Sequence, residues 1–172
     1  MFRYRTRSVW LSVFLWLFSA CSGPPVEELM QAEVALQQAQ FEGAQEYAPE
    51  AFEAAAQAMA DARSRNERKD YEGARRSALD TKDKAEIARS GIDSGKLRMK
   101  EALETDLRNL DTERRQWASS LEKEVYEEQI KQCDEALAEI EARMKAGDYY
   151  GARTVLDRLR EAMKPSLAEQ QK

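Results

Sequence analysis

The chain contains few residues that could carry out chemistry. Its 172 residues include two cysteines and no histidine, so the commonest metal ligand and the commonest general base are both missing. The two thiols lie in different settings. Cys21 follows an apolar run and two small residues, whereas Cys133 lies within a helix-forming segment. The position of Cys21 is therefore the most specific chemical signal in the sequence.

The residues before Cys21 have the layout of a secretory signal. Arg3, Arg5 and Arg7 form a basic start, and an apolar run interrupted by Ser12 extends from residue 9 to residue 18. Counted from residue 8 to residue 20, the segment has 13 residues, whereas a helix needs about 20 apolar residues to cross a bilayer. Residues 1–20 are therefore predicted to be a signal peptide and not a transmembrane helix.

The sequence Phe18-Ser19-Ala20-Cys21 resembles the lipobox of bacterial lipoproteins. The resemblance implies cleavage between Ala20 and Cys21, a diacylglycerol on the Cys21 sulfur and a palmitate-like acyl chain on its amine, which together anchor the chain in a lipid bilayer. Ser22 follows the cysteine, and in the sorting pattern of this family that residue implies transfer to the outer membrane. The alternative is an ordinary signal cleaved after Ala20, with Cys21 as a chance thiol.

Cys133 belongs to the apolar stripe of a predicted helix. It is spaced by three or four residues from its neighbours in a series made of Ile130, Leu137, Ile140 and Met144. We therefore expect a buried free thiol, because cysteine packs in a core as a small hydrophobic residue. The alternative is a disulfide between two chains, which an oxidising compartment would permit.

The charge and the distribution of acids argue against several function classes. After the first 20 residues, the chain has 24 basic and 32 acidic residues, and the two kinds are interspersed along the sequence. A protein that binds nucleic acid needs instead a surface on which basic residues gather. Paired acids such as Glu27-Glu28 and Glu127-Glu128 are typical of solvated helix faces. We therefore expect no nucleic-acid partner, no catalytic residue, no metal site and no cofactor other than the covalent lipid on Cys21.

The body that follows a short tether, residues 21–25, is predicted to be all-α. Good helix formers dominate, and no segment alternates with the period of a strand. A first helix should extend from Val26 to Gly43, and a second should begin at Pro49. The second helix should bury a face that consists of Phe52, Ala55, Ala56, Met59 and Ala62.

A third helix is expected after Asp70, which has the position of an N-cap residue. Its apolar rhythm continues toward Trp117, either unbroken or interrupted at the glycines of residues 91–95. After Trp117 the apolar stripe changes phase, and Ser119 precedes Glu122 by three residues, as in a capping box. A further helix is therefore predicted from about Ser120.

Residues 46–77 are repeated as residues 124–155, at an offset of 78, with ten identities in 32 positions. At the centre of both copies is a turn in which an Asp should cap a helix, while a Gly-Ala pair should allow a neighbouring helix to approach closely. The predicted turn residues are Asp70, Tyr71, Gly73, Ala74, Asp148, Tyr149, Gly151 and Ala152. The turn resembles that of a tetratricopeptide repeat, although the period is not 34 residues.

The predicted fold is an elongated set of antiparallel helical hairpins, or a bundle of the coiled-coil kind, built from two imperfect repeats over residues 26–95 and 96–172. The Tyr47-Ala48-Pro49 and Asp70-Tyr71 elements, set among alanine-rich helices after a lipidated start, resemble the DUF4398 domain of bacterial envelope lipoproteins over residues 26–90. That family has no assigned activity. Some relatives carry a peptidoglycan-binding domain, a function that is not expected here because none precedes Lys172.

Two non-enzymatic functions fit this description. The first is a helical scaffold in the cell envelope, anchored in the outer membrane, facing the periplasm and docking another envelope protein along exposed helix faces. The alternative is a chaperone-like module that binds a peptide or another ligand in a groove between hairpins. The candidate exposed residues for such a groove are Trp117, Tyr126 and Tyr150.

Overall fold

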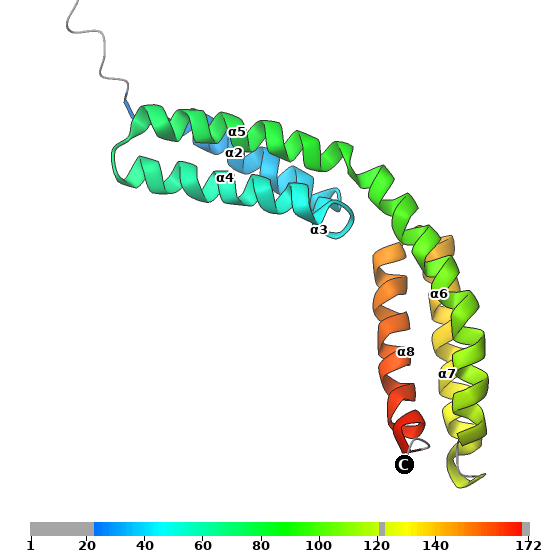
Figure 1. Ribbon diagram of the computed structural model, residues 1–172. Coiled ribbons are helices and arrows are strands. Elements are labelled where there is room, and N and C mark those ends of the chain that lie inside the picture. The colour runs from blue at the N-terminus through cyan, green and yellow to red at the C-terminus, as the bar shows by residue number, and fades with distance from the viewer. Residues whose placement is uncertain (1–22, 121–122, 170–172) are drawn as a thin grey trace, which may run out of the picture. The chain divides into compact units, whose positions relative to one another are not determined.

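The computed structural model describes residues 23–120 and 123–169, without the side chains of residues 120, 123–126 and 165–169. The regular elements of this part are all helices (Figure 1), so the predicted all-α class is confirmed. They are α2 (Val26–Phe41), α3 (Ala44–Tyr47), α4 (Pro49–Glu67), α5 (Tyr71–Ser90), α6 (Ile92–Ser120), α7 (Lys123–Lys145) and α8 (Tyr149–Glu169). The predicted signal peptide, with Ala20 and the lipidation site Cys21, lies outside the described residues.

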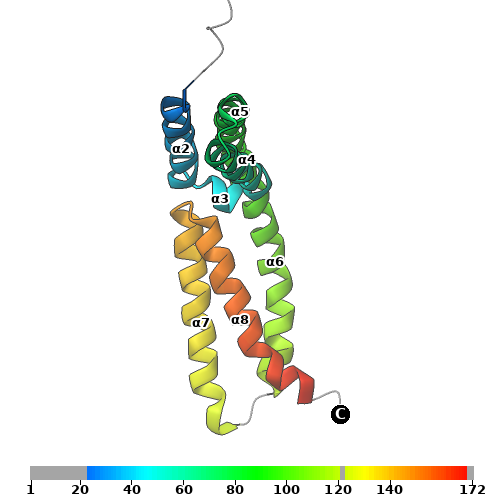
Figure 2. The same cartoon turned by 90° about the vertical axis from the view of Figure 1, so that its left-hand side faces the viewer.

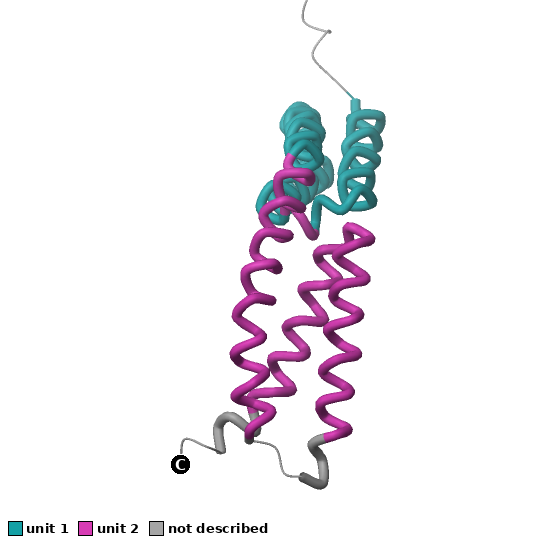
Figure 3. Tube along the Cα trace, turned by 90° about the vertical axis from the view of Figure 1, so that its right-hand side faces the viewer, with its two compact units in different colours: residues 1–45, 49–90 teal, residues 46–48, 91–172 magenta. Residues whose placement is uncertain are grey.

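Two compact units make up the described chain (Figure 3). Unit 1 consists of residues 23–45 and 49–90, and unit 2 consists of residues 46–48 and 91–169. In unit 1, α5 packs against both α2 and α4. In unit 2, α8 packs in the same way against both α6 and α7, and these three helices lie side by side (Figure 2). Each unit is therefore a three-helix bundle whose third helix contacts the other two.

The two bundles are copies of one pattern, related by the offset of 78. The repeat extends beyond the segment detected in the sequence, because α2 corresponds to the second half of α6. The positions that are buried in both bundles form the pairs Pro25/Leu103, Ala32/Leu110, Ala39/Trp117, Ala55/Cys133, Ala62/Ile140, Ala74/Ala152, Ala78/Leu156, Thr81/Leu159 and Ala85/Met163.

The buried positions recur with the spacing of a coiled coil. In α6, Leu103, Leu110 and Trp117 are seven residues apart. In α8, the buried residues Ala152, Leu156, Leu159 and Met163 follow one another at steps of four, three and four, and Val155 is buried beside them. A period near 3.5 residues keeps one seam of a helix against its neighbours. The same heptad positions in unit 1 hold Pro25, just before α2, and Ala32 and Ala39 within it. The two bundles thus share their geometry but not the size of their core side chains.

The core of unit 1 is built almost entirely from alanine, with Met59 as its one large buried side chain among the described residues. The core of unit 2 contains Leu103, Leu110, Ile140 and Leu156, each almost completely buried. Small side chains allow helix axes to approach closely, whereas leucine and tryptophan hold them farther apart. Unit 1 therefore relies on close helix contact, and unit 2 relies on large apolar side chains.

The predicted boundaries of the first two helices are close to the observed ones. α2 ends at Phe41, and Gly43 adopts a left-handed φ of 95°, which a residue with a β-carbon rarely adopts. The short helix α3 was not predicted. α4 begins at Pro49 as expected, but the prediction for its buried face is partly wrong: Phe52 and Ala56 are only half-buried, and Ala58 is buried instead.

Two later boundaries needed the structure. The apolar rhythm after Asp70 is interrupted, because α5 ends at Ser90 and α6 begins at Ile92. The prediction of a helix from Ser120 is wrong by a few residues, because Ser119 still belongs to α6 and its hydroxyl donates to the Gln116 carbonyl at 2.7 Å. The residues between α6 and α7, 121 and 122, lie outside the described ranges.

Candidate functional site: the duplicated turns and the Tyr47 contact

The turns between α4 and α5 and between α7 and α8 have the same backbone geometry. In the first, the Asp70 amide donates to the Arg65 carbonyl at 2.9 Å and the Lys69 amide donates to that of Asn66 at 3.0 Å. In the second, Asp148 and Gly147 make the corresponding bonds at 2.9 and 3.1 Å. This is the Schellman pattern, which requires a left-handed residue after the helix. Lys69 and Gly147 fill that position, with φ of 64° and 78°.

An arginine from the preceding helix holds the aspartate of each turn. The Asp70 carboxylate accepts the Gly73 amide hydrogen at 3.0 Å and contacts Arg65 Nη1 at 3.2 Å. The Asp148 carboxylate accepts the Gly151 amide hydrogen at 2.8 Å, and Arg143 Nη1 lies 2.8 Å from its Oδ2 atom. Each aspartate therefore caps the following helix and pairs with an arginine near the end of the preceding one. These contacts form a clasp at each turn, made of Arg65, Asp70 and Gly73 in the first and of Arg143, Asp148 and Gly151 in the second.

The electrostatics of the turn favour the charged carboxylate. The Gly73 amide, followed by the Arg65 guanidinium, lowers the pKa of Asp70. A hydrogen bond from Arg65, supported by one from Ser77, also lowers the pKa of Asp61, one turn earlier in α4. Both acids stay ionised at neutral pH, which suits a structural clasp and not proton transfer.

Gly73 and Gly151 make room for the capping aspartate of their own turn, a role that was not predicted. These glycines were expected to let a neighbouring helix approach, but the atom nearest to a β-carbon built at either position belongs to the aspartate of the same turn. In both turns the Oδ2 atom of that aspartate would lie 2.1 Å from the added carbon. A glycine is needed three residues after the aspartate because the capping carboxylate occupies the space of a side chain.

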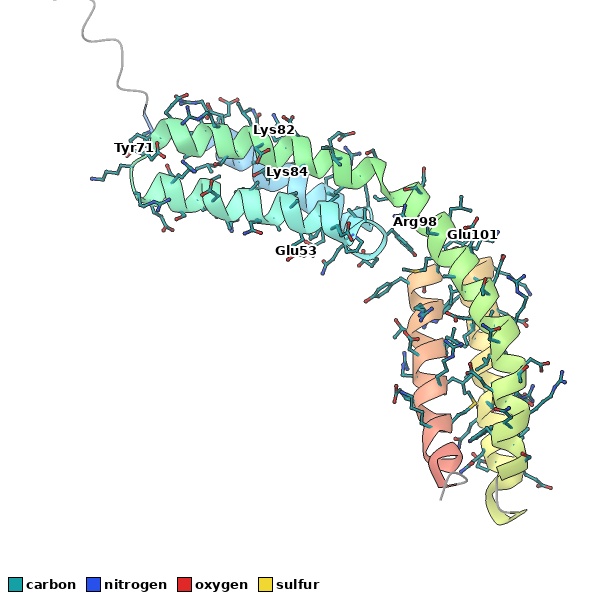
Figure 4. All side chains as sticks on the ribbon, viewed as in Figure 1. Glu53, Tyr71, Lys82, Lys84, Arg98 and Glu101 are labelled. Atoms are coloured by element: carbon teal, nitrogen blue, oxygen red, sulfur yellow. The ribbon has the colours of Figure 1, made fainter. Side chains whose placement is uncertain are left out.

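The remaining predicted turn residues pack within their bundles. Ala74 and Ala152 are fully buried. Tyr149 is half-buried and packs against the core of unit 2, and Tyr71 is half-buried at the start of α5 (Figure 4). The arginines of the clasp, Arg65 and Arg143, were not singled out from the sequence. They are identical across the repeat and therefore could have been found there.

A second shared feature links the first and third helices of each bundle. Arg75 Nε lies 2.6 Å from Glu28 in unit 1, and Arg153 pairs with Asp106 at the corresponding positions of unit 2. The hydrogen bond from Arg75 lowers the pKa of Glu28. Along the same seam, Lys82, labelled in Figure 4, donates to Gln31 at 2.9 Å. These contacts set the register of parallel helices.

Tyr47 makes a contact that sequence reasoning did not find. Its carbonyl oxygen would lie 1.8 Å from a β-carbon built at Gly95, so α6 carries a glycine where the Tyr47 backbone approaches it. The ammonium of Lys96 lies 5.3 Å from the centre of the Tyr47 ring, within the range of a cation–π interaction. The Tyr47 hydroxyl also accepts the Tyr150 amide hydrogen at 3.4 Å. Gly95 was noted only as a possible helix break.

The residues predicted for a ligand groove do not form one in the described structure. Trp117 is 4% exposed and belongs to the core of unit 2. Tyr150 is half exposed, and the Tyr126 side chain lies outside the description. A hollow of about 180 Å³ lies between α6 and α7, with Leu107, Leu110 and Leu137 among its lining residues. Ligand pockets typically have about 300–1,000 Å³, so this hollow is small for a ligand.

A larger hollow, of about 550 Å³, is open along α7. It is lined by Ile130 and Ala138 with charged neighbours that include Lys131 and Asp134. Cys133 is buried, as predicted, and burial raises the pKa of its thiol. Within residues 23–120 and 123–169, no three potential ligands of the Cys, Asp or Glu type gather into a metal site. No helix of this part has the length and apolarity needed to cross a membrane.

Comparison with known families identifies the first bundle. Residues 27–102 match the family model of a domain of unknown function, DUF4398, so this segment is a DUF4398 domain and the predicted resemblance is confirmed. The match includes α2 to α5 and the start of α6, and therefore both Tyr47 and Gly95. No curated protein and no solved structure matches the chain.

Proposed function

We propose that this chain, with its DUF4398 domain, is a non-catalytic helical scaffold that is attached to the bacterial envelope by a lipid on Cys21 and docks another envelope protein. The observation that carries the proposal is the position of Cys21. It ends the lipobox-like sequence, and only four residues separate it from Val26, where the first bundle begins. A lipid at this cysteine would hold unit 1 at a membrane surface.

The ionisable groups support a non-catalytic role. The described carboxylates with shifted pKa values, such as Glu28 and Asp70, are all shifted downward by partners that favour the charge. A general acid needs the opposite shift, toward neutral pH. The arginines of the turns and of the interhelical pairs are used in the same contacts. The charged side chains thus serve to fix helix positions.

The two-bundle organisation supports a scaffold. Each unit has its own core and its own clasped turn, so the chain presents two separate helical surfaces after a single membrane attachment point. Helix faces of this kind bind partner proteins without a recognisable sequence motif. The ligand-binding alternative has less support, because Trp117 is part of the core, the hollow between α6 and α7 is small, and the larger hollow along α7 is wide open to the surface.

The test compares the two cysteines. Cys21→Ser should release the protein from the membrane fraction of cells and prevent incorporation of labelled palmitate, whereas Cys133→Ala should leave both unchanged. Membrane association of the Cys21→Ser protein equal to that of the unmodified chain would refute the lipid anchor. A photocrosslinker placed on exposed helix faces of each bundle should then capture the same envelope protein repeatedly, and loss of that crosslink in the Cys21→Ser strain would tie docking to anchoring.

A further inference from the structure

The outer face of α2 carries an apolar stripe that the bundle does not use. Val26, Met30, Val34 and Phe41 are 69%, 61%, 56% and 92% exposed. Steps of four and seven residues place them on one side of the helix, with Gln37 among them. The buried side is the opposite one, which carries Ala32 and Ala39. A helix in a three-helix bundle needs only one apolar side, so α2 has one more than its fold requires.

The second bundle shows that this stripe is not a requirement of the architecture. At the offset of 78, the four positions are occupied by Glu104, Arg108, Thr112 and Ser119, which are all polar and exposed. The two bundles share nine buried positions, but their outer faces differ. A difference of this kind between two copies of one fold marks a surface with a purpose of its own.

We propose that the apolar stripe of α2 rests on the surface of the membrane in which the Cys21 lipid is inserted. This inference rests on the proposed lipid anchor. The Cα atoms of Cys21 and Val26 can be at most about 18 Å apart, because an extended chain spans about 3.6 Å per residue. The polar layer on each side of a bilayer is about 5–8 Å thick. The tether therefore keeps the first turn of α2 within about 10–13 Å of the outer edge of this layer.

The length of the stripe favours a helix that lies flat. α2 has 16 residues and is therefore about 24 Å long, so an upright helix would hold Phe41 far from the lipids. A flat helix places all four apolar side chains in the interface. Because the anchor keeps the helix within reach of the lipids, even a weak affinity suffices for contact.

The charges around α2 are compatible with a lipid surface. α2 contains no lysine or arginine, so basic residues do not attract it to anionic lipids. Glu28 and Glu33 of α2, and Glu42 just after it, are paired with arginines of α4 and α5. Their charge is therefore compensated within the bundle. We expect the contact to be apolar in origin and insensitive to salt and to the fraction of anionic lipid.

The experiment uses the lipidated chain in vesicles of phosphatidylethanolamine and phosphatidylglycerol. An environment-sensitive fluorophore is attached after Met30→Cys and, as a matched control, after Thr112→Cys at the equivalent exposed position of unit 2. Cys21 carries the lipid and Cys133 is buried, so the introduced thiol is the one that reacts. The Met30 probe should shift to the blue and be quenched by lipids with brominated acyl chains, and the Thr112 probe should do neither.

A second variant tests the whole stripe. Val26→Glu, Val34→Thr and Phe41→Ser, added to the Met30→Cys chain, should abolish the blue shift without reducing helicity, since unit 2 carries these residues at the same positions. A lipidated chain whose Met30 probe stays solvated on vesicles would overturn the membrane contact alone. A shift that is present without vesicles, or that grows with protein density, would overturn it in favour of a protein contact. An intact mass without acyl chains would overturn the anchor, and with it this inference.

Discussion

Lys69 adopts a backbone conformation that glycine adopts in the other copy of the same turn. Its φ of 64° lies in the left-handed region, and Gly147 has a φ of 78° in the equivalent turn. For a residue with a β-carbon this conformation costs about 1–2 kcal/mol, while the greater freedom of glycine in the unfolded chain offsets about 0.5–1 kcal/mol. Lys69→Gly should therefore stabilise unit 1 by about 0.5–1 kcal/mol, and Gly147→Lys should destabilise unit 2 by a similar amount.

The assay is thermal unfolding of the unlipidated chain without residues 1–20 and with Cys21→Ser, followed by calorimetry. For a cooperative unit of 60–100 residues, this change in free energy corresponds to an increase of about 2–8 °C in Tm for Lys69→Gly. Lys69→Ala is the control, because it removes the charged side chain but keeps the β-carbon and should not stabilise. If Lys69→Gly leaves Tm unchanged, or if Lys69→Ala raises it equally, the effect of backbone strain is refuted.

Three further predictions concern the turn clasp and the core. Gly73→Ala should destabilise unit 1 by displacing the capping carboxylate. In an Asp70→Ala background the same change should stabilise unit 1 by about 1 kcal/mol, because alanine has the higher helix propensity. Urea titration of the unmodified chain, the two single variants and the double variant will show this. The folded state lowers the pKa values of Asp70 and Asp61. The stability that these carboxylates contribute is therefore fully present above their unfolded pKa near about 4, and it should be lost as the pH falls through their folded pKa values. Unfolding followed by circular dichroism from about pH 6 to pH 2 will measure this loss. Leu156→Ala should lower the free energy of unfolding of unit 2 by about 2–5 kcal/mol, because it leaves a cavity. Ala78→Leu should lower that of unit 1 by about 1–3 kcal/mol, because it overpacks the core. A higher urea midpoint after either change would contradict the packing described for the two cores.

Much of the fold was predictable because its determinants are local. Pro49, Gly43 and Asp70 mark helix boundaries through their own backbone chemistry, and the structure places helix ends close to them. The extension of the repeat into α2 and α6 was not detected, because the shared positions there hold different residues, such as Ala32 and Leu110. Only burial shows that these positions are equivalent, and burial depends on contacts between distant segments.

The candidate site was only partly predictable. The aspartates and glycines of the turns stand out as repeated residues, but the sequence did not reveal that the glycine makes room for the aspartate. The contact between Tyr47 and Gly95 joins residues 48 positions apart in the sequence. Neither a helix propensity nor an apolar period contains information on a close approach of this kind.

A comparison of the two copies separates what the architecture needs from what it does not. The clasped turn and the ion pair between the first and third helices, Glu28–Arg75 and Asp106–Arg153, are present in both bundles. Because both copies retain them, these charged residues are explained by folding and need no further role. Core size and outer surface differ instead, and a bundle with an alanine core has no folding reason to expose Phe41 and Met30. A surface with a role beyond folding is therefore to be sought where the copies differ, and the outer face of α2 is such a difference among the described residues.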